Sequence, residues 1–500
     1  MSQEFDAVVV GSGPNGLAAA VTLSAAGLTV LVVEGADTPG GGCRTEELTV
    51  AGFGHDVCSI AHPLAAGSSF FRRFDLAGRG VRLLHPEVVF AQPLDGGRAG
   101  IAYRSLDRTA AELGADRAVY RRMLGNLVGH ATEVMDWVLS DQRRPPTRPD
   151  VMAAYALAGL RPATSQARRF STPEARGLLA GVSAHAMLPL ENAPTAGIGL
   201  FLTLLAHSVG WPVIEGGSAR LVDALLDAFR SAGGTVQTGW WVKTLDELPS
   251  ARAVLLDVSP RRLLAMAGDK LPTGYRRGLS RYRYGAGICK VDFALDGAVP
   301  WTNETCQKAG TLHLGGGFEE VAASAQEVAA GRHPDSPYVL VAQPGVADPS
   351  RAPAGKATLW TYSHVPAGSD VDVSDRIERQ IERFAPGFRD LILAKTVRTA
   401  LQQEHYDPNC IGGDIACGVQ DLRQSFARPV ARWDPYRTPA EGVYLCSSAT
   451  TPGPGVHGRC GELAARSALR RTFRIRQPPD LSVSGRLASK TTRLATSRPK

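Results

Sequence analysis

Continuous apolar runs and glycine-rich turns alternate at the start of the chain. Residues 8–10 and 29–33 are apolar and strand-like, and the small residues at 17–20 between them favour a helix. Glu34 follows the second apolar run directly. A strand, a turn, a helix, a second strand and an acidic residue in this order predict a βαβ unit.

The turn after the first strand carries three glycines, Gly11, Gly13 and Gly16. Gly11 permits a tight turn, Gly13 lets the backbone approach a pyrophosphate, and Gly16 lets the helix pack closely on the strand. The start of the helix offers free N–H groups and a partial positive charge to phosphates. Glu34 is placed to accept hydrogen bonds from a ribose. We therefore predict a dinucleotide site, with Pro14 and Asn15 in the same turn.

Helical and strand-like periods recur through the rest of the chain. Helices are predicted at 107–140, at 196–206, within 210–239, and from a Ser374 or Asp375 cap to Phe384. Strands are predicted at 251–260, 286–296, 337–343 and 357–365. We find no internal repeat.

The last patterned segment, 441–473, reads as a strand, a second glycine-rich turn and a helix. A dinucleotide site needs only one such turn. FAD is long enough to reach both, with its adenine half at the first turn and its flavin at the second, where a helix N-terminus would stabilise the reduced ring. The alternative is that 442–474 only adds a closing strand and helix to the sheet.

Composition narrows the function classes. A chain of 500 residues with 44% apolar and 21% charged residues predicts two or more globular domains. The net charge of +7 is concentrated in 477–500, which has five basic residues and one acid, so we expect no nucleic-acid partner. This tail is predicted to be disordered beyond Gln477. It could contact anionic lipid headgroups, although a solvated terminus is the simpler reading.

The eight cysteines form no CxxC pair, and no HExxH or GxSxG motif occurs, so we predict neither a metal site nor an esterase. The N-terminus shows no leader segment and 196–206 is too short to span a bilayer, which indicates a reduced, cytoplasmic protein. The glycines at 315–317 are expected to lack the strand and helix of a nicotinamide site. The electron acceptor would then be oxygen, a quinone or a redox partner.

The chain resembles the phytoene-desaturase-type branch of FAD-dependent oxidoreductases, which also holds carotenoid isomerases and retinol saturases. Within it, the likeness is greatest to bacterial relatives of the pyridine nucleotide-disulphide oxidoreductase domain-containing protein 2 group. The likeness covers residues 5 to about 472 and rests on VVVGSGPNGLAAA, the GGGxRT loop, GWPVIEGGSARLVDAL, LLDVSP and YRTPAEGVYLCSSATTPGPGVHG.

The resemblance implies an α/β fold, with a Rossmann-like FAD-binding domain of the amine-oxidase and phytoene-desaturase type and an interleaved α+β substrate domain. The FAD-binding domain would comprise 1–75, 205–290 and 410–475. The substrate domain would comprise 76–204, expected to be helical, and 291–409. The basic tail is 476–500.

The resemblance also assigns residues to non-covalently bound FAD. The first turn and Glu34 would hold the adenosine diphosphate half, and Val242 would contact the adenine. Two further sets would follow the pyrophosphate, ribityl chain and isoalloxazine: Gly41, Gly42, Arg44 and Thr45, then Ser447, Ser448, Gly455, Val456 and His457. Three departures put the flavin's electronics in doubt: Ser447-Ser448 in place of Gly-Asp, Pro454 within a glycine run, and Arg459 where a methionine is common.

An enzyme of this type would remove a hydride from an apolar substrate carbon, forming or isomerising a C=C bond of a lipophilic molecule. His457, His55 and His62 are the candidate catalytic groups, although His457 could simply cap a backbone carbonyl. Two alternatives remain: a low-turnover flavin-binding regulatory or scaffold protein, and an amine oxidase. An amine oxidase would use an aromatic pair at the flavin. The candidates for this pair are Trp360 with Tyr362, or Trp240 with Trp241. If they do not have this role, we expect them to be core residues.

Overall fold

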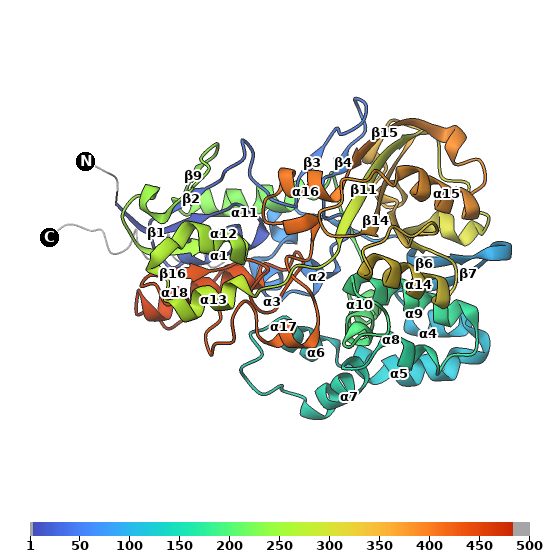
Figure 1. Cartoon of the computed structure of the whole chain (residues 1–500), viewed down its shortest axis with the longest axis horizontal. Coiled ribbons are helices and arrows are strands. Elements are labelled where there is room, and N and C mark those ends of the chain that lie inside the picture. The colour runs from blue at the N-terminus through green and yellow to red at the C-terminus, as the bar shows by residue number, and fades with distance from the viewer. Residues whose placement is uncertain (1–3, 484–500) are drawn as a thin grey trace.

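Two β-sheets lie side by side in the computed structural model, which describes residues 4–483 (Figure 1). The first sheet is parallel and unites strands from both ends of the chain. Its order is β16 (Val443–Leu445), β10 (Ala251–Leu256), β1 (Phe5–Val10), β2 (Val30–Val33) and β9 (Thr235–Gln237). Because β1 is central, the predicted βαβ unit forms the middle of this sheet.

Both faces of the first sheet are buried, which explains its continuous apolar strands. In β1, Ala7 and Val9 face one helical layer, and Val8 and Val10 face the other. The first layer contains α1 (Pro14–Ala25), α11 (Ala219–Ser231) and α18 (Arg459–Arg471), and the second contains α12 (Pro260–Ala267) and α13 (Thr273–Ser280).

Helix α18 packs directly on α1, and a glycine makes this possible. A Cβ on Gly461 would lie 1.8 Å from the carbonyl oxygen of Asn15. The first turn of α18 therefore lies against the first turn of α1, although the two are more than 400 residues apart in sequence.

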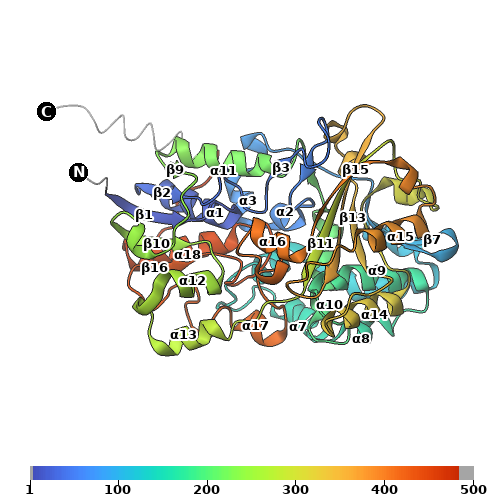
Figure 2. The same ribbon diagram turned by 45° about the horizontal axis from the view of Figure 1, so that its top comes forward.

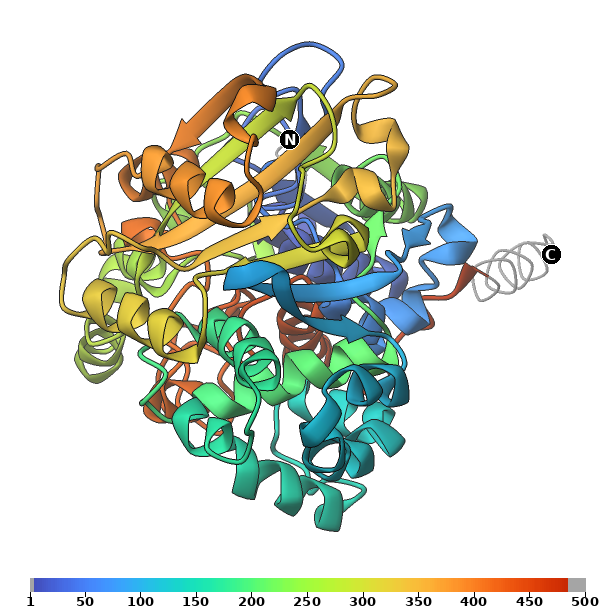
Figure 3. The same ribbon diagram turned by 90° about the vertical axis from the view of Figure 1, so that its right-hand side faces the viewer.

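The second sheet has seven strands and is mostly antiparallel. Its order is β15 (Ile392–Arg398), β11 (Gly287–Leu295), β14 (Ala357–Val365), β13 (Val339–Ala342), β12 (Ala309–Leu314), β6 (Val88–Leu94) and β7 (Arg98–Tyr103). A helical layer covers one face and α15 (Ser374–Phe384) the other (Figure 3). That layer comprises α4 (Leu106–Glu112), α5 (Arg117–Gly129), α6 (Ala131–Val138), α7 (Pro149–Gly159), α8 (Ala163–Ala167), α9 (Pro173–Ser183), α10 (Thr195–Ser208) and α14 (Phe318–Ala329).

Short elements fill the space between the two sheets. Helices α2 (Pro63–Gly67) and α16 (Ala400–Tyr406) lie there (Figure 2), and the short helices α3 (Ser69–Phe74) and α17 (Leu422–Phe426) belong to neighbouring segments. Two small antiparallel pairs join β3 (Thr45–Glu46) to β4 (His55–Asp56), and β5 (Leu83–Leu84) to β8 (Val213–Ile214).

Several predicted elements are confirmed, including 196–206 within α10 and 357–365 as β14. The predicted helix at 107–140 is wrong as a single element. It is three helices, because Gly114 adopts a φ of 52° and α5 ends at Gly129. The predicted cap of α15 is also wrong, since Val373 is its N-cap. Strands β6 and β7 were missed because 76–204 was expected to be helical.

Two further expectations need correction. The glycines at 315–317 do lie between a strand, β12, and a helix, α14. That helix has Glu319 and Glu320 in its first turn, and such charges oppose phosphate binding there. Disorder was predicted beyond Gln477, yet Leu481 is buried in the core of the first sheet, where its carbonyl accepts a hydrogen bond from Arg79. Residues 484–500 lie outside the described residues. The predicted domain boundaries stay a prediction.

Candidate dinucleotide and substrate cavity

A cavity of about 730 Å³ lies between the two sheets. One end is formed by the carboxyl ends of β1, β2 and β10, through Val10, Glu34 and Asp257. The other end is formed by the face of the second sheet that bears Trp360 and Tyr362. Parallel α/β sheets bind their ligands at the carboxyl ends of their strands, so the first end is the expected place for a dinucleotide.

The two glycine-rich turns meet on the wall of this one cavity. Gly13 from the first turn and Gly455 from the second both line it. Between them, the side-chain amide of Asn15 donates to the hydroxyl of Ser448 over 3.3 Å. A ligand in the cavity can therefore contact both ends of the chain at once.

Glu34 is held at the tip of β2 by its own backbone surroundings. Its carboxylate accepts hydrogen bonds from the N–H groups of Ser12 and Ala36, both over 2.9 Å. This fixes the carboxylate on the cavity wall, in the position expected for a ribose contact.

The loop after β2 closes over the first turn, and its polar groups suit a pyrophosphate. A Cβ on Gly41 would lie 3.0 Å from the Cα of Gly13, so the two backbones are in contact. Arg44 lines the cavity and is 9% exposed, and its Nη2 donates to the carbonyl of Thr38 over 2.6 Å. Its Nε and the Oδ1 of Asn15 are buried without partners. The unpartnered Nε–H donor of Arg44 and the glycine cradle fit the phosphates of FAD, whereas the Oδ1 of Asn15 can only accept a hydrogen bond from a donor group.

The other residues assigned to the cofactor divide into two groups. One group lines the cavity: Pro14, Gly42, Ser447, Ser448, Val456 and Val242, the last of which follows β9. Gly11 also lines it. Gly16 and Thr45 do not lie on the wall. Thr45 instead donates to Asp56 over 2.7 Å and accepts from the N–H of Ala219 over 3.1 Å.

Sequence analysis missed Asp257, which stands at the end of β10 in the LLDVSP segment. Its Oδ2 accepts the N–H of Gly16 over 2.8 Å, at the start of α1. Burial, together with the nearby carboxylates of Asp407 and Glu34, raises the pKa of Asp257 from 3.8 to about 7. A protonated carboxyl here spares the phosphate site an additional negative charge. The sequence held a signal for this residue, because Asp257 directly follows an apolar run that forms a buried parallel strand beside β1.

This raised pKa predicts that FAD affinity falls as the pH rises through about 7. Above that value Asp257 ionises, and its negative charge would repel the phosphates of bound FAD. FAD therefore binds better to the protonated form, and its affinity falls as the proton is lost. For the same reason the apoprotein loses stability as the pH rises from about 3.8 to about 7. Fluorescence titration of apoprotein with FAD between pH 6 and 9, approximate limits that bracket this pKa, measures the effect.

The control is Asp257→Asn, which cannot ionise and should bind FAD with a nearly flat pH dependence. A wild-type affinity that does not change across the range would contradict the assignment.

Two of the three predicted catalytic histidines do not lie on the cavity wall. His457 is fully buried in the second turn, where its Nδ1 accepts the N–H of Arg459 over 3.0 Å and its Nε2 donates to the carbonyl of Gly453 over 3.1 Å. Burial lowers its pKa to about 4. His457 therefore caps a backbone carbonyl, which was the alternative to a catalytic role. His55 lies in β4, where its Nε2 bonds the hydroxyl of Thr49 over 2.8 Å.

His62 does line the cavity. Its Nε2 bonds the hydroxyl of Ser218 over 2.9 Å, and its Nδ1 is buried without a partner. Burial lowers its pKa to about 4, so it is neutral at physiological pH. A neutral ring with one free nitrogen can accept a proton or a hydrogen bond.

A second histidine on the wall, His185, was not among the predicted catalytic groups. Its Nε2 lies 3.0 Å from the Nε2 of His313 in β12, so one ring must donate to the other. Burial lowers the pKa of His185 to about 4 and that of His313 further below its usual range. The pair places a polar group on the wall near the second sheet, where Thr311 and Gln420 also line the cavity. No local sequence pattern links the two histidines.

The end of the cavity at the second sheet is apolar. Leu340, Ala342, Trp360 and Tyr362 line it from the strands, and Phe201 lines it from α10. The rings of Trp360 and Tyr362 meet edge to face, with centroids 5.3 Å apart. Trp360 and Tyr362 belong to a hydrophobic core, as predicted, and they also line the cavity. Trp240 and Trp241 line the dinucleotide end.

Charge is distributed unevenly along the cavity. The carboxylates that line it, from Glu34, Asp257 and Asp407, all lie with the dinucleotide residues. Its mouth carries exposed apolar side chains: Leu160 is 47% exposed and Phe426 is 65% exposed, and both belong to the wall. Among residues 4–483 no helix is long and apolar enough to cross a bilayer, and no cluster of three metal-ligating side chains occurs in that range.

Comparison with known proteins agrees with this geometry. A family model for an NAD(P)-binding Rossmann-like domain matches residues 9–74. The pyridine nucleotide-disulfide oxidoreductase domain-containing protein 2 of Mus musculus is 26% identical over 94% of each chain. All-trans-zeta-carotene desaturase of Myxococcus xanthus is 25% identical over 90% of each chain. A solved structure of putrescine oxidase, an A394C variant, superposes with a TM-score of 0.61 at 16% identity, covering 94% of this chain and all of that one.

These matches establish the fold. The chain contains a Rossmann-like dinucleotide-binding domain within an α/β architecture, as predicted, and its fold is similar to that of putrescine oxidase. The residues that match the family model include the end of β1, the first glycine-rich turn, α1 and β2. The second sheet lies entirely outside the matched residues.

Proposed function

We propose that the chain is an FAD-dependent oxidoreductase that desaturates or isomerises a C–C bond of a lipophilic small molecule. One observation carries the proposal: Gly13 and Gly455, from glycine-rich turns at opposite ends of the chain, line one cavity. A dinucleotide that binds at one glycine-rich turn needs only the first of these two turns. An extended cofactor with a pyrophosphate at one turn and a ring system at the other uses both.

The chain's own residues suit the parts of such a cofactor. Glu34 would hold the adenosine ribose, Arg44 and the first turn the pyrophosphate, and Asn15 with Ser448 the ribityl chain. When bound, FAD supplies a two-electron acceptor for a hydride. The second sheet closes the far side of the cavity and keeps water away from that position.

The substrate class follows from the wall of the cavity. Apolar and aromatic side chains dominate the end at the second sheet, and the exposed Leu160 and Phe426 mark the mouth. A long apolar molecule gains most from such surroundings. The likeness to a carotene desaturase supports the same class. We expect oxygen, a quinone or a redox partner to accept the electrons.

The proton lost with the hydride needs an acceptor on this wall. His62 and His185 are the candidates, since both line the cavity and are neutral, whereas His55 and His457 do not lie on its wall. His185 lies closer to the apolar end through its contact with Trp211, whose ring centroid is 5.7 Å away. His313 behind it could take up or return the proton.

His185→Phe is expected to keep FAD and to slow substrate oxidation by about a hundredfold, the usual scale of general-base catalysis. Anaerobic stopped-flow reduction of the flavin measures the step. His333→Phe is the control, because His333 bonds Ser369 outside the cavity. Equal rates in the two variants would exclude His185 as the proton acceptor.

The proposal is tested by purification followed by anaerobic addition of lipid fractions. The protein should be yellow, and one fraction should bleach the flavin and yield a product about two daltons lighter if a C–C bond is desaturated. A colourless protein that binds no added FAD would refute it. A yellow protein that no fraction bleaches would favour the flavin-binding regulatory or scaffold alternative.

An amine oxidase is the second candidate, favoured by the Trp360–Tyr362 pair on the wall and by the shared fold with putrescine oxidase. The charge distribution argues against it, because the lining carboxylates lie at the dinucleotide end and an ammonium group would meet none among the apolar residues. Flavin reduction by putrescine or cyclohexylamine would decide for this alternative.

A further inference from the structure

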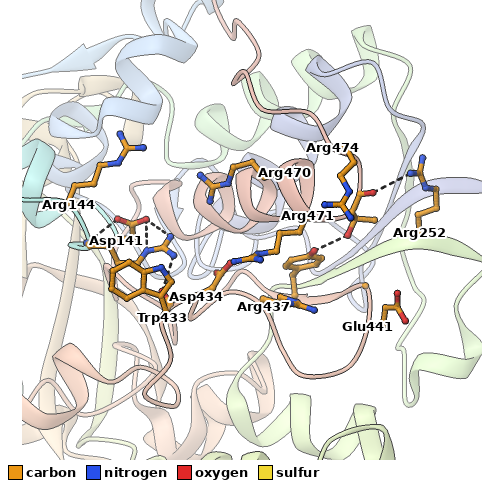
Figure 4. A pocket seen from close by; sticks show the side chains of 14 residues that line it. Asp141, Arg144, Arg252, Trp433, Asp434, Arg437, Glu441, Arg470, Arg471 and Arg474 are labelled. Atoms are coloured by element: carbon orange, nitrogen blue, oxygen red, sulfur yellow. Dashed lines mark hydrogen bonds and ion pairs between the residues drawn. The ribbon is translucent and has the colours of Figure 1, made fainter.

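A second cleft, of about 780 Å³, opens on the surface beside the first sheet (Figure 4). Seven arginines and three carboxylates line it, a formal excess of four positive charges. The arginines come from several parts of the chain: Arg143 and Arg144 precede α7, Arg252 is in β10, Arg437 precedes β16, and Arg470, Arg471 and Arg474 lie at and beyond the end of α18.

Most of this charge is not neutralised within the protein. Arg143 pairs with Asp141, Arg252 lies 3.8 Å from Asp6, and Arg471 lies 3.5 Å from Asp434. The other four lining arginines have no carboxylate partner among the described residues: Arg144, Arg437, Arg470 and Arg474. Figure 4 shows the last three on different sides of Arg471. Like charges that line one cleft repel one another unless an anion lies between them.

The end of α18 explains only part of the cluster. Arginines in a last helical turn stabilise the helix dipole, which accounts for Arg470 and Arg471. It does not account for Arg437, which precedes β16, or for Arg474, which lies beyond the helix with a left-handed φ of 62°. A residue other than glycine adopts that conformation at a cost, and such costs are commonly found where a side chain is needed.

An aromatic surface completes the cleft. Trp433 is 76% exposed, and its carbonyl is held by the Nη1 of Arg143 over 2.9 Å. The hydroxyl groups of Tyr444 and Thr472, 2.9 Å apart, add neutral hydrogen-bonding groups to the lining. Guanidinium groups bind phosphates through paired hydrogen bonds, and an exposed indole stacks on a planar base.

We propose that this cleft binds a soluble nucleotide with two or more phosphates, the phosphates among Arg437, Arg470 and Arg474 and the base against Trp433. The cleft is separate from the dinucleotide cavity, although residues 137–144 form part of both walls: Trp137 and Leu139 line the cavity, and Asp141 and Arg144 line the cleft. A bound nucleotide would therefore contact a segment that borders the flavin.

The test is isothermal titration of FAD-saturated protein with ADP and with inorganic pyrophosphate at about 0.15 M salt, where weak surface attraction is screened. ADP should bind saturably and be displaced by pyrophosphate. Arg470→Ser combined with Arg474→Ser should weaken both ligands by about tenfold or more. Trp433→Ala should weaken ADP by about tenfold and leave pyrophosphate unchanged.

Arg230→Ser is the matched control, since Arg230 is also an exposed arginine in the last turn of a helix, α11, remote from the cleft. It should leave both affinities unchanged. An unaltered flavin content in every variant shows that the chain is folded and the first cavity filled.

Three results would overturn the proposal. The first is the absence of saturable ADP binding at that salt concentration. The second is an equal loss of affinity in Arg230→Ser. The third is binding of vesicles containing phosphatidic acid that requires Arg470 and Arg474 but is not reduced by ADP, since the occupant would then be a lipid headgroup.

Discussion

Gly16→Ala is expected to purify without flavin. A Cβ on Gly16 would lie 2.1 Å from the carbonyl oxygen of Gly11 and 3.1 Å from the Oδ2 of Asp257. The first contact is with backbone, so α1 would have to move away from β1, and the N–H groups at its start would leave the phosphate site. The ratio of flavin to protein absorbance after purification measures the effect.

Gly125→Ala provides the control within the same chain. Gly125 is also in a helix, α5, and a Cβ there would meet nothing within 4 Å. Alanine should keep the flavin and stabilise the helix by about 0.5–1 kcal/mol. If Gly16→Ala retained a full complement of FAD with an unchanged spectrum, the close approach of α1 to β1 would not be needed for binding.

Arg351→Ala is expected to lower the free energy of unfolding by about 3–5 kcal/mol, the range for breaking a buried ion pair. Arg351 is 2% exposed, and it donates to Asp56 and to Asp348, each over 2.8 Å. Alanine would leave both carboxylates in the interior without their cation. Asp56 also accepts the N–H of Ser218 and the hydroxyl of Thr45, next to Arg44, so flavin affinity should fall as well.

Chemical denaturation of the FAD-saturated protein measures this loss of stability. Arg332→Ala is the control, because its pair with Glu327 is exposed to solvent and contributes little. Equal midpoints for the two variants would show that the buried cluster around Arg351 does not stabilise the fold.

The dinucleotide end of the cavity was largely predictable from the sequence because its determinants are local. The positions of Gly11, Gly13 and Gly16, the apolar strands around them and the acidic residue after the second strand fall within thirty residues, and each has a direct physical reason. Sheet periodicity likewise indicated β10, β11 and β14. The helical prediction for 107–140 failed because its apolar spacing continues across Gly129, where α5 ends, and because the backbone also turns at Gly114.

The catalytic assignments depended on information that is not local. A histidine in a glycine-rich turn looks the same in sequence whether it faces the cavity or, like His457, bonds its own backbone. His185 and His313 are 128 positions apart, and only the packing of the helical layer on the second sheet brings their rings together.

By itself, the sequence determined that this protein has a βαβ dinucleotide unit at its start, a second glycine-rich turn near its end and a globular chain between them, since spacing and hydrophobic period act over a few residues. The tertiary structure alone decided that both turns share one cavity, that Asp257 stands beside the first glycine-rich turn and that scattered arginines line one cleft. These features depend on which distant segments pack against each other, and that is set by burial of the two sheets rather than by any short pattern.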